Sequence, residues 1–112
     1  MYTYKATIIR WIDGDTLQVE IDLGFYVQTI QKIRLARIDA PEMNNTVAYR
    51  ERQAKHARAV AKKFCPEGAT VTITTTKQNK DQYARYIAEV TYNDTNMSDY
   101  LIDKGVAKLW RG

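Results

Sequence analysis

Apolar and polar residues alternate through the first third of the chain, as they do in strands that bury one face. Residues 4–11 are rich in β-branched and aromatic types, and Leu17, Val19 and Ile21 alternate with polar neighbours. The segment 13–15, Asp-Gly-Asp, predicts a hairpin turn between them, because glycine tolerates positive φ and aspartate bonds nearby backbone. Gly24 marks a second turn or bulge, and a third strand is expected from about 27 to 38.

The period changes after Pro41. Residues 44–46, Asn-Asn-Thr, offer a helix cap, and apolar residues then recur at helical spacing. The positions that share this face are Ala54, Ala57, Val60, Ala61 and Phe64. They predict a helix over 47–64 with a stop at 66–68, followed by strands over 69–76 and 86–92 and a short helix over 97–105, with Gly105 at its C-cap.

This order predicts a mainly β fold with helices (α+β), a five-stranded Greek-key barrel of the OB type. One long helix lies between the third and fourth strands, and a short helix lies near the C-terminus. An SH3-like barrel would not usually carry the long helix. With 112 residues the chain has room for one core, so a single domain over 1–112 is expected.

Composition changes this picture little. The formal charge of +4 suits a polyanionic partner but is common among globular domains. Neither a basic leader with an apolar run nor a stretch of membrane-spanning length is visible, so we expect no signal peptide and no membrane partner. The chain as given would be cytoplasmic or the mature part of an exported protein. Its single cysteine, Cys65, is expected to be a small buried side chain rather than a reactive thiol.

Four acids stand at the ends of predicted strands, namely Asp13, Asp15, Asp39 and Glu42. Taken singly, each segment is also an ordinary turn or strand exit. Taken together, the carboxylates would repel one another unless a cation lies between them, and hard oxygen ligands suit Ca²⁺ or Mg²⁺.

Two arginines of the predicted third strand, Arg34 and Arg37, come just before Asp39 and Glu42 in the sequence. Side chains alternate between the faces of a strand, so one of the two should point toward the acids. A metal held by two aspartates, a third carboxylate acting on water and a guanidinium fork would together form a site that cleaves phosphate esters.

Four motifs in chain order carry a resemblance to a known family. They are DGDT (13–16), RL followed by IDAPE (34–42), DQYAR (81–85) and L-x-x-x-G-x-A-K (101–108). Together they resemble the staphylococcal nuclease (thermonuclease-like) family over essentially the whole chain. That family has a five-stranded OB barrel with helices packed on it, in agreement with the order of elements predicted above.

The resemblance implies a role for each matching residue. Asp15, Asp39 and the backbone carbonyl of Ala40 would hold Ca²⁺, and Glu42 would orient or deprotonate the attacking water. Arg34 would bind the reacting phosphate.

In the motif DQYAR, Arg85 would be the second phosphate-binding arginine, and Tyr83 would touch the terminal phosphate of the substrate. Asp81, together with Asp13 of the first motif, would support the ligands or stabilise a loop.

The implied activity is a Ca²⁺-dependent phosphodiesterase, endonuclease or exonuclease, acting on single-stranded or frayed DNA and RNA and leaving 3′-phosphates. Only the nucleic acid substrates are expected as partners, and the chain is expected to be a monomer. The alternative is a catalytically silent member that binds nucleic acid or protein. Such relatives lose acids or arginines of the site, whereas here all five of these residues are present: Asp15, Arg34, Asp39, Glu42 and Arg85.

The chain departs from the family pattern in several places. Gln82 and Ala84 stand where lysine and glycine are frequent, and Ala40 replaces a threonine. The long C-terminal helix and a tyrosine pair of the better-known members have no counterpart. Two roles for Trp110 are left open, a replacement stacking surface or packing on the barrel. His56, among the basic residues of the predicted helix, is expected to be a solvated surface residue.

Overall fold

The structure, a computed structural model, describes residues 2–41, 48–75 and 86–110. Five longer strands build the barrel: β1 (Tyr2–Asp13), β2 (Thr16–Asp22), β3 (Gln28–Leu35), β5 (Thr70–Thr75) and β6 (Tyr86–Tyr92). The remaining elements are three two-residue strands and two helices: β4 (Ile38–Asp39), β7 (Thr95–Asn96), β8 (Lys108–Leu109), α1 (Ala48–Phe64) and α2 (Met97–Asp103).

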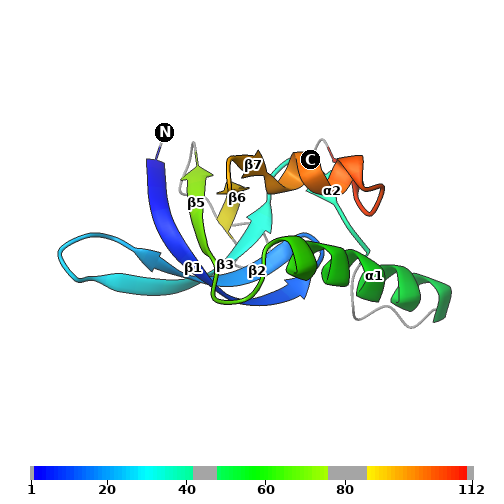
Figure 1. Ribbon diagram of the computed structural model, residues 1–112, viewed down its shortest axis with the longest axis horizontal. Coiled ribbons are helices and arrows are strands. Elements are labelled where there is room, and N and C mark those ends of the chain that lie inside the picture. Colours follow the sequence, from blue (N-terminus) through cyan, green and yellow to red (C-terminus); the bar gives the residue numbers. More distant parts are fainter. Residues whose placement is uncertain (1, 42–47, 76–85, 111–112) are drawn as a thin grey trace.

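The barrel closes through one parallel contact. The strand order is β3-β2-β1-β5-β6-β7, and β3 also pairs in parallel with β6 over 33–35 and 86–88. All other barrel pairings are antiparallel. The result is a five-stranded mixed barrel with α1 after the third barrel strand and α2 near the C-terminus, consistent with an OB fold (Figure 1). The predicted fold is confirmed.

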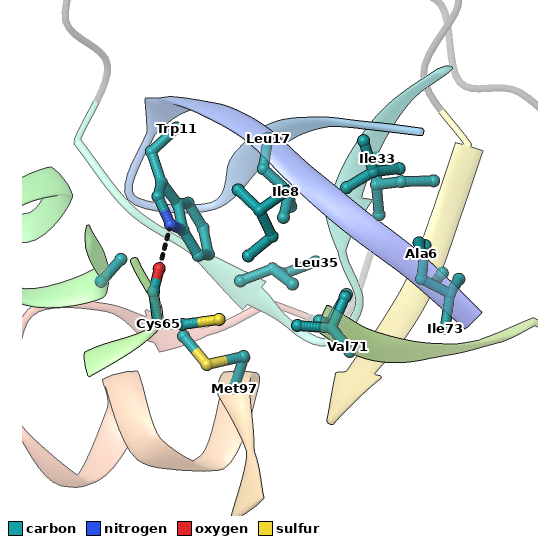
Figure 2. Close-up of a cluster of buried hydrophobic side chains, with 14 of the residues drawn as sticks. Ala6, Ile8, Trp11, Leu17, Ile33, Leu35, Cys65, Val71, Ile73 and Met97 are labelled. Carbon is teal, nitrogen blue, oxygen red and sulfur yellow. Dashed lines mark hydrogen bonds between the residues drawn. The ribbon is translucent and has the colours of Figure 1, made fainter. Parts of the chain in front are cut away.

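The core fills the barrel and continues beneath the helices (Figure 2). The alternating residues Leu17, Val19 and Ile21 all point inward, because one face of β2 is buried. Cys65 is fully buried, and burial raises the pKa of its thiol to about 12, so it is the inert small side chain that the sequence predicts. Its carbonyl accepts a 2.8 Å hydrogen bond from the indole of Trp11.

Helix α1 is held by close packing, whereas the C-terminus of α2 is held by backbone hydrogen bonds. Every buried residue of α1 is alanine (Ala54, Ala57 and Ala61), so the helix lies close to the sheet. At the end of α2, Gly105 has a φ of 73° and donates to Ile102, while Val106 donates to Leu101. This Schellman arrangement places the glycine one position beyond the cap residue Lys104.

The third strand is shorter than predicted. It ends at Leu35, and a turn with Arg37 at a φ of 71° separates it from β4, which pairs with β8. Alternation alone could not reveal this break, because two-residue strands have no period of their own and β8 lies far away in sequence. In the described ranges, neither helix is long and apolar enough to cross a membrane.

The β2–β3 hairpin extends away from the barrel, at the end of the longest axis opposite to α1 (Figure 1). Gly24 has a φ of 80° in its turn, which confirms the predicted turn. The next two residues, Phe25 and Tyr26, are fully exposed at its tip.

Candidate active site

The turn between β1 and β2 is pressed against α1 and against the segment that follows β4. A Cβ added to Gly14 would lie 2.9 Å from the Cβ of Ala57 and 3.2 Å from that of Ala40. Glycine is required here by this close approach and not by a left-handed φ, which Gly14 does not adopt. A positive φ at this glycine, the basis on which the turn was predicted, is therefore wrong, although the turn itself is present. The contact brings Asp15 and Ala40 into one place.

Asp15 follows Gly14 and is 4% exposed. One carboxylate oxygen accepts a 2.9 Å hydrogen bond from the backbone N–H of Ala40, and the other accepts one of 3.0 Å from the hydroxyl of Thr16. Burial raises the pKa of Asp15, aided by the charge of Asp13, although the Ala40 hydrogen bond and the Arg34 charge oppose the shift. A further cation at this carboxylate would favour its ionised form.

Arg34 is the arginine that faces the acids. Its side chain is 9% exposed, and Nη1 donates to the carbonyl of Ile38 at 3.0 Å. The same Nη1 lies 3.4 Å from Oδ2 of Asp15, while Nη2 lies 3.4 Å from Oδ1 of Asp39. One guanidinium thus bridges the two aspartates.

Arg37 points elsewhere. Its guanidinium pairs with Glu89 at 2.7 Å and with Asp99 at 2.9 Å, and it also donates a hydrogen bond to Asn96. The Glu89 and Asp99 hydrogen bonds raise the pKa of Arg37 further. This group ties the turn after β3 to β6 and to the start of α2.

The ring of Trp110 covers the guanidinium of Arg34, and this contact was not predicted from the sequence. The centroid of its ring lies 4.6 Å from the guanidinium carbon, and its backbone N–H donates to the carbonyl of Arg37 at 2.8 Å. The β4–β8 pairing, Ile38 with Leu109 and Asp39 with Lys108, brings the tryptophan there. Because that pairing is long-range, no local signal in the sequence indicates the contact.

The donor chemistry at this place fits Ca²⁺. The carboxylates of Asp15 and Asp39 converge on the guanidinium of Arg34, and the backbone N–H of Ala40 bonds to Asp15, so the carbonyl of that residue would be the third oxygen donor. Among the described residues, no group of three or more His, Cys, Asp or Glu side chains forms a metal site. Since Ca²⁺ takes about six to eight oxygen ligands, water would have to supply part of its shell.

The other predicted site residues are placed as follows. Asp13 ends β1, half-buried and opposite Thr16 across the turn. Glu42, Asp81, Tyr83 and Arg85, together with the departures Gln82 and Ala84, lie outside the described residues.

A cleft of about 650 Å³ adjoins Asp39 and runs between α1 and the segment 105–108. Its walls are formed by Asp39, Ala40, Pro41, Arg50, Gln53, His56, Gly105, Val106, Ala107 and Lys108. His56 is exposed, as expected, but it belongs to this cleft wall.

Fold and site together define an OB-type barrel protein in which two aspartates and a buried arginine lie close together, at the β1–β2 turn, near the end of β3 and on β4. A scan of protein families matches residues 32–111 to the one described as staphylococcal nuclease homologue, and the chain belongs to this family. The match covers Arg34 and Asp39 but begins after Asp15. A search of curated proteins found no significant match.

Proposed function

We propose that the chain is a single-domain Ca²⁺-dependent phosphodiesterase that hydrolyses single-stranded or frayed DNA and RNA. The observation that carries the proposal is the buried guanidinium of Arg34, held between Asp15 and Asp39. Membership of the staphylococcal nuclease family supports it. Nucleic acid is the proposed partner, with no obligate protein partner, and the chain is proposed to act as a monomer.

Arg34 would bind the reacting phosphate. A guanidinium has five N–H donors and stays charged, so it can contact phosphate oxygens while one donor remains on the carbonyl of Ile38. Its burial lowers the local dielectric and strengthens the attraction for a phosphate whose negative charge increases in the transition state.

Asp15, Asp39 and the backbone carbonyl of Ala40 would hold the Ca²⁺, which when bound supplies positive charge at the phosphate. Asp15 is held in place by Ala40 and Thr16, so its carboxylate is oriented before any ligand arrives.

The remaining roles follow from the resemblance. Glu42 would direct water in line at phosphorus, Arg85 would supply a second guanidinium, and Tyr83 would contact a terminal phosphate. Asp13 and Asp81 would support this arrangement. Water would form the new bond to phosphorus and give up one proton to Glu42 or to solvent, while the bond to the 5′-oxygen breaks and solvent protonates that oxygen, so that the product ends in a 3′-phosphate.

The test is cleavage of a labelled single-stranded DNA with Ca²⁺ or with a chelator. Wild type would be compared with Glu42→Gln, Arg34→Gln and the control Lys32→Gln, an exposed residue of the same strand. We expect cleavage that requires Ca²⁺, is lost by about a hundredfold or more in the first two variants, and is kept in the control. A folded wild-type protein that binds the strand but never cleaves it would instead establish a catalytically silent binding module.

A further inference from the structure

The cleft beside the candidate site has a charged lining that the proposed chemistry does not use. It opens at Asp39 and Ala40 and continues along α1, where Arg50, Gln53 and His56 line it; Lys108 faces them from β8. Among the described residues of its wall, Asp39 is the only acid, and it lies at the end nearest Arg34. The rest of the cleft therefore favours an anion.

The basic residues of this wall are not neutralised within the described part of the chain. Arg50 and Lys108 form no ion pair there, whereas two other lysines of the same region are paired, Lys55 with Glu51 and Lys62 with Glu67. Unpaired cations that share one concave surface focus a positive potential in it. The two glutamates in these pairs, Glu51 and Glu67, do not line the cleft, so they do not neutralise its positive charge.

Size and chemistry both narrow the choice of ligand. A volume of about 650 Å³ lies within the ordinary range of small-ligand sites, about 300 to 1,000 Å³. The lining is rich in hydrogen-bond donors and basic groups, which contact phosphate and sugar oxygens in nucleic acid complexes.

We propose that this cleft binds the sugar–phosphate backbone of a single-stranded polynucleotide beyond the phosphate held at Arg34. The inference rests on the proposed function and deepens it, because it makes an extended strand, rather than a mononucleotide ester, the preferred substrate. Arg50 and Lys108 contact successive phosphates, and Gln53 and His56 donate hydrogen bonds to backbone oxygens. Backbone contacts of this kind carry no base sequence, so cleavage is sequence-tolerant.

The test compares variants of equal charge. Arg50→Gln and Lys108→Gln remove a cation from the cleft, and Arg52→Gln removes one from α1 outside it. Each protein is assayed on a 12-nucleotide single strand and on the p-nitrophenyl ester of a mononucleotide, at several salt concentrations. We expect each cleft variant to raise KM for the strand by roughly threefold to tenfold without changing kcat, and to leave both constants for the ester unchanged.

The slope of log affinity against log salt should also become shallower by roughly 0.7 for each cleft cation removed. Arg52→Gln should change neither KM nor the slope. Equal effects of Arg50→Gln and Arg52→Gln, or equal effects on strand and ester, would overturn the inference.

If wild type cleaves neither substrate, the proposed function fails. Binding of the same strand, measured by fluorescence anisotropy in the presence of a chelator, then tests whether the cleft binds the strand independently of cleavage. Weaker binding only in the two cleft variants supports the inference. Binding that is unchanged in them overturns it.

Discussion

The guanidinium of Arg34 lies over the face of the Trp110 indole ring, with 4.6 Å between the guanidinium carbon and the ring centroid. Arg34 is 7% exposed, and a desolvated cation–π contact contributes about 2 kcal/mol. Four groups thus orient one guanidinium: the aromatic ring lies against its face, and the carbonyl of Ile38 and the carboxylates of Asp15 and Asp39 lie at its edge. Trp110 is a positioning residue for Arg34 in the proposed reaction.

Replacing Trp110 should therefore affect catalysis through Arg34. We expect Trp110→Ala to lower kcat by about tenfold, because the guanidinium loses the face that fixes its plane. Trp110→Phe should keep most of the rate, and Trp110→Leu, which is apolar but has no π-face, should behave like alanine. Single-turnover cleavage with the enzyme in saturating excess over the strand measures this. Equal rates for the phenylalanine and leucine variants would show that only apolar packing matters.

Gly14 should tolerate no side chain. Gly14→Ala places a methyl group 2.9 Å from the Cβ of Ala57 and is expected to destabilise the fold by about 1–3 kcal/mol in urea unfolding. The double variant Gly14→Ala/Ala57→Gly removes that clash, although glycine in a helix itself costs about 1 kcal/mol. In this double-mutant cycle, the double variant should lose less stability than the sum of the losses in the two single variants. Strict additivity would mean that the turn and α1 adjust independently.

Arg37 combines a strained backbone with a set of ion pairs. Its φ of 71° favours glycine, whereas its guanidinium binds Glu89 and Asp99. We expect Arg37→Ala to lower the free energy of unfolding by about 1–2 kcal/mol. Arg37→Gly should lose less, since it removes the same ion pairs but relieves the φ strain. Urea unfolding of both variants measures the two free energies. A glycine variant that is less stable than the alanine variant would contradict the role of φ strain at this position.

The raised pKa of Asp15 predicts a pH dependence of stability. Because burial dominates, the folded protein binds the proton of Asp15 more tightly than the unfolded chain does. This group therefore stabilises the fold most below its unfolded value of 3.8, and that stability is lost as pH rises through the higher folded value.

The matching variant is Asp15→Asn. It should be more stable than wild type at pH 7, and the difference should shrink toward pH 3, as measured by urea unfolding across that range. Asp103→Asn, at an exposed position of α2, is the control and should shift stability little at either pH. An advantage of Asp15→Asn that does not change with pH would show that the buried charge is not its cause.

Local pattern was sufficient for most of the fold. The strands β1, β2, β5 and β6 and both helices lie close to their predicted ranges, because each buries one face of regular period. That one arginine near the end of β3 would face the acids was also foreseen, and Arg34 is that residue.

What the sequence could not supply depends on contacts between distant residues. The β4–β8 pairing, the position of Trp110 and the reason for glycine at position 14 all arise from segments far apart in the chain. The roles of Glu42, Tyr83 and Arg85 stay predictions from the family resemblance.

The β4–β8 pairing has a consequence for the time at which activity would arise. Asp15, Arg34 and Asp39 leave the ribosome early, whereas β8 and Trp110 are synthesised roughly 70 residues later, several seconds at ordinary rates. Until then the arginine has neither its aromatic cover nor the strand that holds Asp39. A nascent chain would therefore remain inactive toward RNA while the message that encodes it is still being read.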